Sequence, residues 1–357
     1  MVKHGKHTYS EIMSQPAVWE STLADFEAQI PDVNTLWQRA RPQRVLFTGC
    51  GSTHYLSMAA ANLCQALTSI PAQARPASEL VLFPDLVYAA GEDTLLVAIS
   101  RSGTTTETLD ALALFKSRTG GRALTITCYG DSPLSTGADA RLVAAAAQEQ
   151  SVAQTRSFSS MAVLVQALCG TLAGLPVASL LAPLPGLCDR LLTDYHDLAR
   201  ELGGSPDIER FFFLGSGFLY GIAAEAMLKM KEMSLSYSEA YHCLEFRHGP
   251  MSMANERTLM TGLLSEPAQA HEAAVLREMH ARGATVLAES ERGSGLAPGE
   301  RTHEVTLASD LPAWARTILY LPVLHLLAYY RAIANGQNPD RPAHLEAVVS
   351  LDSLLAD

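Results

Sequence analysis

The sequence predicts an α/β protein built from two doubly wound parallel sheets, and three observations support this prediction. The chain has 357 residues, a length that suits two domains of roughly 150 residues better than one core. Apolar, strand-like runs alternate with helical segments, a pattern typical of parallel sheets with helices on both faces. The same order of segments occurs once in each half of the chain, which indicates an internal duplication.

Each half begins with an apolar strand that passes through a Gly-x-Gly turn into a helix. A second strand and helix follow, and then a further strand. The expected pairs, first half and then second, are strand and turn 44–52 and 210–217, helix 56–67 and 222–228, strand 94–99 and 259–264, helix 105–115 and 268–279, and strand 123–128 and 285–288.

The boundaries of the domains follow from shifts in composition. The joint between the halves lies between Pro183 and the run Gly203-Gly204-Ser205-Pro206, with helical sequence at 187–202. An amphipathic stretch at 18–30 indicates an N-terminal helix, and another apolar helix is expected at 319–333. We predict an N-terminal helical segment (1–34), a first α/β domain (35–185), a helical linker (186–204) and a second α/β domain with a C-terminal tail (205–357).

Composition limits the classes of function. Hydrophobic residues make up 48% of the chain and charged residues 18%, which is typical of a well-packed globular protein. The net charge of −11 argues against binding to nucleic acid or to anionic membranes, because both need a basic surface. An anionic small substrate therefore needs positive groups placed locally.

The cysteines and the apolar runs indicate the compartment. The six cysteines are scattered, without the paired spacing of a zinc site, so we expect reduced thiols and no metal. The N-terminus has no apolar core of a secretory signal, and glycines and a proline interrupt the apolar run at 161–181. We expect a cytoplasmic protein without membrane contacts.

One short run is the strongest candidate for a binding site. The apolar strand at 94–99 ends in Ser100-Arg101-Ser102-Gly103-Thr104-Thr105. Hydroxyls, a glycine and a cation before a helix N-terminus form an oxyanion site, although an ordinary capped turn has the same composition. The second half has Leu264-Ser265-Glu266-Pro267 at the equivalent place, where a carboxylate and a proline exclude this kind of phosphate site.

The two Gly-x-Gly turns do not indicate a dinucleotide. The turns Gly49-Cys50-Gly51 and Gly215-Ser216-Gly217 both lack the third glycine of the G-x-G-x-x-G fingerprint. A nicotinamide-dependent enzyme is therefore disfavoured, and no cofactor is expected.

Candidate catalytic groups lie in the second half. Glu232 follows Lys229 by three residues near the end of a predicted helix, and His248 follows in a Gly-Pro turn. Aldose–ketose chemistry needs one group that moves a proton between C1 and C2 and another that opens the sugar ring. The alternatives are a surface ion pair for Lys229 and Glu232, and a turn residue for His248.

These residues occur in motifs through which the chain resembles the double sugar-isomerase (SIS) domain family, which includes the isomerase domain of glucosamine-6-phosphate synthase. The motifs follow the family order across nearly the whole chain. The resemblance implies two flavodoxin-like α/β/α subdomains. The matching motifs are Cys50-Gly51-Ser52-Thr53, Ser100-x-Ser102-Gly103-x-Thr105, Val152-Ala153-Gln154-Thr155-Arg156-Ser157-Phe158, Leu214-Gly215-x-Gly217, Leu228-Lys229-Met230-Lys231-Glu232 and Glu245-x-Arg247-His248-Gly249-Pro250.

The resemblance also implies roles for individual residues. Glu232 matches the base that moves the proton between C1 and C2, Lys229 a lysine that assists it, and His248 the ring-opening histidine. In the family this histidine is contributed across a dimer interface, so we expect a homodimer with its active site at or near that interface. The implied phosphate and sugar contacts are Ser100, Arg101, Ser102, Thr105, Gly51, Ser52, Thr53, Val152, Ala153 and Gln154.

Two departures from the synthase modify the expected activity. The chain starts Met1-Val2-Lys3 and not with a glutaminase domain, and Ala347 stands where the family has a Schiff-base lysine. We therefore expect a glucosamine-6-phosphate deaminase of the SIS type, which forms fructose 6-phosphate and ammonia. A ketose–aldose isomerase of another sugar phosphate and a non-catalytic phosphosugar-binding regulator remain open, as does the stereochemistry of the sugar.

Overall fold

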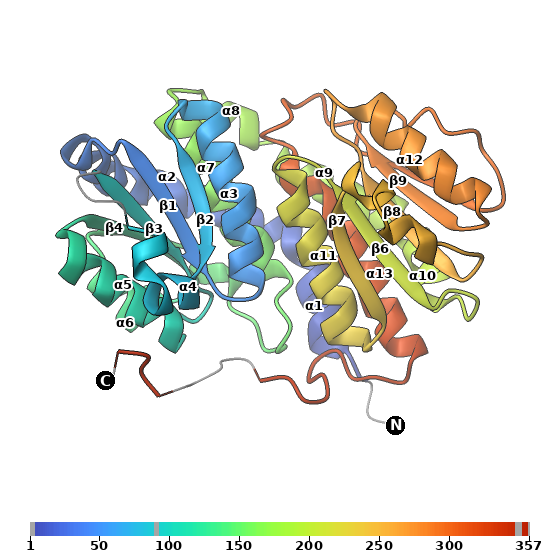
Figure 1. The fold of residues 1–357 in the computed structure, drawn as a ribbon, viewed down its shortest axis with the longest axis horizontal. Helices are drawn as coiled ribbons and strands as arrows, with labels where there is room; N and C mark the ends of the chain where they lie inside the picture. Colours follow the sequence, from blue (N-terminus) through green and yellow to red (C-terminus); the bar gives the residue numbers. More distant parts are fainter. Residues whose placement is uncertain (1–3, 89–92, 347–351, 356–357) are drawn as a thin grey trace. The chain divides into compact units, whose positions relative to one another are not determined.

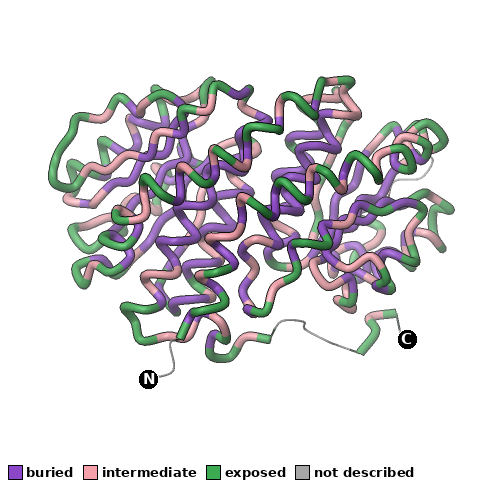
Figure 2. Tube along the Cα trace, turned by 180° about the vertical axis from the view of Figure 1, so that it is seen from behind, coloured by how far each residue is buried: buried purple, intermediate pink, exposed green. Residues whose placement is uncertain are grey.

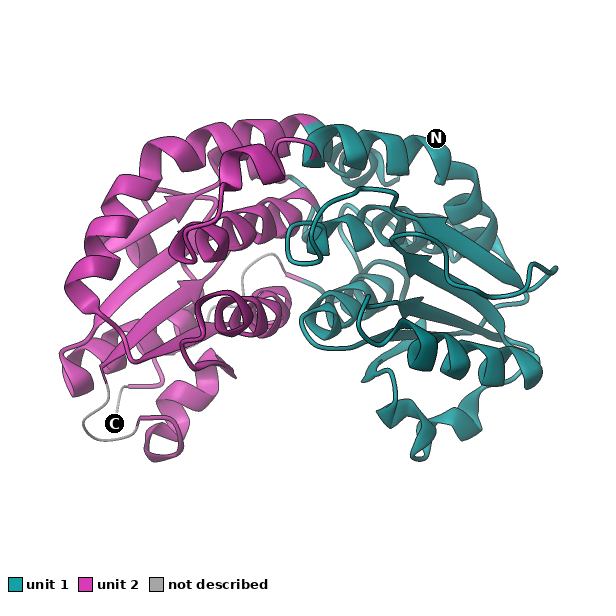
Figure 3. Ribbon diagram, turned by 90° about the horizontal axis from the view of Figure 1, so that it is seen from above, with its two compact units in different colours: residues 1–16, 150–155, 184–345 teal, residues 17–149, 156–183, 346–357 magenta. Residues whose placement is uncertain are grey.

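The computed structural model describes residues 4–88, 93–346 and 352–355, drawn as a ribbon in Figure 1. The chain forms two compact units, coloured separately in Figure 3. Neither unit is one continuous segment, and the boundaries of the four segments predicted above remain predictions. Unit 1 consists of residues 1–16, 150–155 and 184–345, and unit 2 consists of residues 17–149, 156–183 and 346–357.

Unit 2 contains a five-stranded parallel sheet in the order β2-β1-β3-β4-β5. The register places Val45 beside both Ala72 and Leu95, so β1 pairs with a neighbour on each side. The strands are β1 (Arg44–Gly49), β2 (Ala72–Pro76), β3 (Thr94–Ile99), β4 (Arg122–Thr127) and β5 (Ala140–Val143). The helices are α2 (Gln15–Ala40), α3 (Ser52–Thr68), α4 (Ala77–Leu82), α5 (Thr106–Thr119), α6 (Pro133–Gly137), α7 (Arg156–Leu172) and α8 (Val177–Leu181).

Helices cover both faces of this sheet, because side chains of alternate strand residues point to opposite sides. Leu46 and Leu96 pack in one core cluster with residues of α4, α5 and α6. Val45 and Val97, on the opposite face, meet residues of α2, α3 and α7. Figure 2 shows the buried strands between more exposed helical surfaces.

Unit 1 repeats this architecture with a second parallel sheet, in the order β10-β9-β8-β6-β7. In both sheets the first strand along the chain lies between the second and the third, and the fourth and fifth follow outward. The strands are β6 (Arg210–Gly215), β7 (Tyr237–His242), β8 (Thr258–Leu263), β9 (Thr285–Ser290) and β10 (Thr302–Thr306). The helices are α1 (Lys6–Met13), α9 (Leu184–Asp194), α10 (His196–Gly204), α11 (Leu219–Ser234), α12 (Gln269–Ala281) and α13 (Pro322–Ala334).

The shared strand order confirms the predicted fold class of two duplicated, doubly wound α/β sheets. Several details differ from the predictions. The linker sequence forms two helices, α9 and α10, which are separated at Tyr195, and α2 extends ten residues beyond Ile30 to Ala40. The structure also has short 3₁₀ helices at Pro84–Leu86, Ala145–Ala147, Glu245–Arg247, Pro250–Met253 and Thr317–Tyr320.

One helical stretch among the described residues, Thr317–Ala334, has the length and apolar composition of a membrane span, but 78% of it is buried in the structure. It consists of the last 3₁₀ helix and α13, and α13 packs against α10 and α11. Burial against neighbouring helices is typical of the core helix of a globular unit.

Candidate functional site

The predicted phosphate turn of unit 2 connects the end of β3 to the start of α5. Ser100 Oγ lies 3.3 Å from Thr105 Oγ1 and accepts a 3.2 Å hydrogen bond from the backbone N–H of Gly103. Ser102 Oγ accepts from the backbone N–H of Thr104 at 3.2 Å. The turn is thus a compact loop of hydroxyls and N–H groups at a helix N-terminus, a geometry that favours an oxyanion.

Gly51, Ser52 and Thr53 form a second turn, between β1 and α3. Gly51 adopts a positive φ of 55°, and the following hydroxyl residues Ser52 and Thr53 are buried in the first turn of α3. Thr53 Oγ1 is fixed by the backbone of Cys50, donating to its carbonyl at 2.9 Å and accepting from its N–H at 3.0 Å.

The two turns follow strands that are neighbours in the sheet. The chain leaves β1 toward β2 on one side and returns to β3 on the other, so the strand order reverses between β1 and β3. Ligands of doubly wound sheets bind at the carboxyl ends of the strands at this reversal point. The topology therefore brings Ser52, Thr53 and the Ser100–Thr105 turn to the same carboxyl edge of the sheet.

Arg101, within the phosphate turn, lies beside an acidic partner from the same unit. Its guanidinium lies 3.6 Å from the fully buried carboxylate of Glu149, which also accepts from Ser157 Oγ. The carbonyl of Arg101 accepts from the N–H of Cys128 at 3.1 Å, which ties the turn to the end of β4. The contact of Arg101 with phosphate remains a prediction, because the structure also assigns this side chain an internal partner.

Lys229 and Glu232 lie on α11 in unit 1, as predicted, but they do not form the surface pair that was the alternative. The Lys229 side chain is 1% exposed, and its Nζ lies 3.4 Å from Glu225 Oε1 and contacts Glu232. Glu232 is the partly exposed member of the group, at 18%. A buried cation thus lies directly beside the carboxylate predicted to act as the base.

His325 on α13 is a further buried residue near this group. Burial, followed by the positive charge of Lys229, lowers the pKa of His325 to about 3. Both ring nitrogens are buried without a hydrogen-bond partner among the described residues.

Glu225 and His325 were not predicted from the sequence. The spacing of Glu225 four residues before Lys229, and a single histidine inside an apolar helix, were the available signals.

His248 lies in an exposed turn of unit 1, after the 3₁₀ helix Glu245–Arg247. Within the described residues its imidazole has no hydrogen bond, and no contact joins it to Lys229 or Glu232. An exposed, uncommitted imidazole is compatible with a role across a subunit interface, and its ring-opening role remains a prediction.

The residues Val152, Ala153 and Gln154 also belong to unit 1. The backbone N–H of Val152 donates to the carbonyl of Asp340 at 3.0 Å, and the carbonyl of Ala153 accepts from Ser151 Oγ at 3.2 Å. Gln154 Oε1 is buried and lacks a hydrogen-bond partner among the described residues. Backbone groups of Val152 and Ala153 thus help to hold this loop within unit 1.

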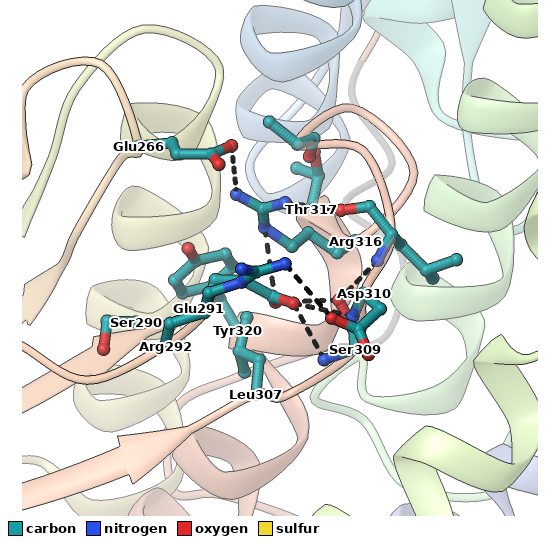
Figure 4. A network of polar contacts seen from close by, with 12 residues as sticks. Glu266, Ser290, Glu291, Arg292, Leu307, Ser309, Asp310, Arg316, Thr317 and Tyr320 are labelled. Atoms are coloured by element: carbon teal, nitrogen blue, oxygen red, sulfur yellow. Dashed lines mark hydrogen bonds and ion pairs between the residues drawn. The ribbon is translucent and has the colours of Figure 1, made fainter.

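The equivalent of the phosphate turn in unit 1 is filled by protein groups, as Figure 4 shows. Leu264 N donates to the Glu289 carbonyl at 2.8 Å, as Ser100 N donates to Ile126 in unit 2 at 3.1 Å. At this strand end the guanidinium of Arg316 lies 2.9 Å from Glu266 and 3.5 Å from Glu291. An internal ion-pair network therefore replaces the hydroxyl turn in the duplicate.

Two predictions concern metal ions and the tail. The residues that the structure describes contain no group of three or more histidine, cysteine or acidic residues that could hold a metal ion. All six cysteines are described and none forms a disulfide. Ala347, at the position of the family's lysine, lies outside the described residues.

The chain is similar to known proteins in its family, its sequence and its fold. A family model described as "SIS domain" matches residues 40–169 and 207–306, more than half of the chain. The chain is 32% identical over 362 residues to glutamine–fructose-6-phosphate aminotransferase (isomerizing) of Pseudomonas putida. This match covers 96% of the chain and 58% of the relative, so the chain spans little more than half the length of such relatives.

Solved structures with the same fold are equally informative. Glucosamine-6-phosphate deaminase from Thermotoga maritima superposes with a TM-score of 0.77 and 28% identity, covering 97% of this chain and 100% of that one. Tagatose-6-phosphate ketose/aldose isomerase from Escherichia coli superposes with a TM-score of 0.83, 22% identity and coverages of 99% and 98%, which shows the shared fold.

Proposed function

Because this chain belongs to the SIS domain family of phosphosugar isomerases, we propose that it is a glucosamine-6-phosphate deaminase, which converts glucosamine 6-phosphate and water into fructose 6-phosphate and ammonia. The observation that carries the proposal is the buried Lys229, which holds the partly exposed Glu232. The similarity to the Thermotoga maritima deaminase, which extends over the full length of that chain, supports the choice of substrate.

The first half of the proposed reaction is an internal proton transfer. His248 moves a proton between the anomeric hydroxyl and the ring oxygen, which opens the ring to the C1 aldehyde. Glu232 then removes the C2 proton. The C–H electron pair becomes the C1–C2 double bond, and the aldehyde oxygen takes up a proton to form an enolamine. Lys229 assists these steps by holding Glu232 in place through their ion pair.

The second half of the reaction releases the nitrogen. Glu232 returns its proton to C1, so that C2 becomes an imine of fructose 6-phosphate. Water adds to C2, the C2–N bond breaks with its electron pair on nitrogen, and ammonia leaves. These reaction steps together consume one water and require neither an oxidant nor a lysine imine. They agree with the presence of Ala347 at the position of the family's lysine.

The two turns at the carboxyl edge of the sheet in unit 2 are proposed to hold the phosphate and the sugar chain. The hydroxyls of Ser100, Ser102 and Thr105 and the N-termini of α3 and α5 supply hydrogen-bond donors and positive dipole ends for the dianion. We further propose that the protein is cytoplasmic and that its active form is a homodimer. The exposed imidazole of His248 supports the homodimer, because it is available to a second subunit.

The test is an assay of ammonia and fructose 6-phosphate from glucosamine 6-phosphate. Wild-type protein should release one ammonia for each fructose 6-phosphate. Glu232→Gln keeps the shape of the side chain but removes the base, so kcat should fall by about 10²- to 10⁴-fold. Glu27→Gln, on the exposed surface of α2, is the control and should retain full activity.

Other results would replace the proposal with one of the alternatives. A ketose product without ammonia, from any sugar phosphate of a panel, would indicate a ketose–aldose isomerase. Tight binding of glucosamine 6-phosphate without exchange of its C2 proton in heavy water would indicate a phosphosugar-binding regulator. Unchanged turnover in Glu232→Gln would exclude the assigned base.

A further inference from the structure

Glu11 is a buried carboxylate that the proposed reaction does not use. It lies on α1 and is 3% exposed. Its Oε1 accepts a 2.6 Å hydrogen bond from the backbone N–H of Gln150. The N–H of Ser151 lies 3.4 Å from both carboxylate oxygens, and Ser151 Oγ donates to Oε2. One side chain therefore binds two successive backbone N–H groups of a loop that is about 140 residues away in sequence.

The next residue of the same loop is also held through α1. The N–H of Val152 donates to the carbonyl of Asp340. The carboxylate of Asp340 in turn accepts from Thr8, from its backbone N–H at 2.8 Å and from its hydroxyl at 2.9 Å. Glu11 thus binds two N–H groups of the loop, and Asp340 binds the next one. Asp340 is itself held by Thr8, which lies on the same helix as Glu11.

This arrangement fixes the backbone of the loop at residues 150–152. Hydrogen bonds to an ionised acceptor are about twice as strong as neutral ones, so Glu11 is the strongest anchor of the loop. Gln154, two residues beyond the anchored backbone, has a buried amide oxygen without a partner. A loop with a fixed backbone and an unused acceptor suits the binding of a polar ligand, because little ordering entropy is lost on binding.

We propose that Glu11 is a positioning residue that holds residues 150–154 in the conformation that binds the sugar phosphate. The inference rests on the proposed function, because it takes the ligand of this loop to be the sugar of the proposed reaction. It adds a residue from the N-terminal helix, which none of the motifs includes. Loss of this anchor should weaken sugar binding and leave the chemical step largely intact.

The chain offers a matched control in Glu272. This carboxylate, on α12, is fully buried and accepts from the backbone N–H of Ser265 at 2.6 Å and from its hydroxyl at 3.0 Å. Glu272 therefore binds the N–H and the hydroxyl of a serine as Glu11 does, and both pairs lie in unit 1. The Ser265 turn, however, is the duplicate of the phosphate turn and has no predicted ligand.

The experiment compares wild type, Glu11→Gln, Ser151→Ala and Glu272→Gln in steady-state kinetics with glucosamine 6-phosphate and in calorimetric binding of fructose 6-phosphate. Glu11→Gln turns an amide N–H₂ toward the donors of the loop, so KM and Kd should rise about tenfold, the loss expected for one charge-assisted hydrogen bond. kcat should stay within about threefold of wild type. Glu272→Gln should change none of the three constants, although its thermal midpoint falls to a similar extent.

Two results would overturn the inference. One is a KM and Kd of Glu11→Gln within twofold of wild type. The other is an equal rise in both constants for Glu272→Gln, which would assign the effect to general loosening of the unit. If Glu11→Gln does not fold, Ser151→Ala decides: it removes the hydroxyl that contacts Glu11 and the carbonyl of Ala153 but leaves the carboxylate in place, and an unchanged Kd rejects the role. Failure of wild type to release ammonia rejects the proposed function instead, and binding of fructose 6-phosphate still tests Glu11.

Discussion

At the scale of single residues, Gly103 determines whether the phosphate turn can form. Its φ is +65°, and a Cβ at this position would lie 2.1 Å from Ser132 Oγ and 2.5 Å from Ser132 Cβ. Ser132 cannot move freely, because its hydroxyl caps α6 by accepting from the N–H of Ser135. The close approach of two turns therefore requires glycine here, independently of any bound phosphate.

Gly103→Ala should impair both folding and binding. The left-handed backbone and the clash together should cost about 2–4 kcal/mol in the free energy of unfolding. The displaced N–H and hydroxyl groups should weaken the binding of a sugar phosphate by at least about tenfold. Urea unfolding and calorimetry with fructose 6-phosphate measure the two effects.

Gly120→Ala is the control for Gly103→Ala. Gly120 ends α5 with a similar φ of +62°, but an added Cβ meets nothing within 4 Å. Its substitution should cost about 1 kcal/mol in stability, and binding should not change. Equal losses of binding in the two variants would contradict the role given to the phosphate turn.

His325 should make the stability of the protein sensitive to acid. Burial and Lys229 lower its pKa in the folded state to about 3, whereas the unfolded chain has a pKa of about 6.5. Between these values the unfolded state binds one more proton, so stability falls as the pH falls from 6.5 toward 3. The contribution approaches about 1.4 kcal/mol per pH unit in this window.

His325→Gln removes this titration and keeps a polar side chain. The urea midpoint of the variant should therefore fall less steeply than that of wild type between pH 6 and pH 4, an effect that a set of unfolding curves measures directly. His271→Gln, on the exposed surface of α12, should leave the slope unchanged. Parallel slopes for wild type and His325→Gln would show that His325 does not titrate in this way.

At the scale of secondary-structure elements, α11 carries three of its four charged groups on one face. Glu225, Lys229 and Glu232 are separated by four and three residues, the spacing of neighbours on a helix surface. The helix packs against α13, so Lys229 and Glu225 are removed from water. The element therefore positions the carboxylate proposed as the base through an ion pair with a lysine that is buried in the core.

A double-mutant cycle tests this pair. Lys229→Met leaves two carboxylates without their cation, which should cost about 3–5 kcal/mol in the free energy of unfolding. Adding Glu225→Gln should recover part of this loss, because the buried negative charge is removed as well. The coupling energy from urea unfolding should then be about 1–3 kcal/mol. Additive losses would mean that the two side chains do not interact.

The inner strands of both sheets could be predicted from the sequence, and the edge strands could not. The strands β1, β3, β4, β6, β8 and β9 lie inside the sheets, and their continuous apolar runs identified them. The strands β2, β5, β7 and β10 are the four edges and were not predicted. An edge strand pairs on one side only and is partly exposed, as in β7 (Tyr237–His242), so its residues need not be apolar.

At the scale of the whole molecule, sites formed by one short run of residues could be predicted. Contacts between residues that are far apart in the sequence could not. The Ser100–Thr105 turn is a single run, so its hydroxyls and its helix start are visible in the sequence. The burial of Lys229 depends on α13, about 100 residues later, and the contact of Glu11 with Ser151 spans 140 residues. A single amino-acid sequence contains no local signal for such distant contacts.

The proposed homodimer predicts complementation between inactive variants. If Glu232 of one subunit acts with His248 of the other, a mixed dimer of Glu232→Gln and His248→Ala contains one intact site. Random exchange of equal amounts should restore about a quarter of wild-type activity, since half of the dimers are mixed. The assay is ammonia release after refolding the two variants together, with each variant refolded alone as the control. No recovery would place both residues in one chain or exclude the dimer.

The Arg316 network gives the duplicated fold a simple binding stoichiometry. Glu266 and Glu291 are tethered beside Arg316, so a dissolved phosphate would have to compete with two intramolecular carboxylates for this guanidinium. Because Arg316 is already paired with these carboxylates, this strand end of unit 1 should not bind a phosphate. Although each chain contains the fold twice, its titration with a sugar phosphate should follow a one-site isotherm.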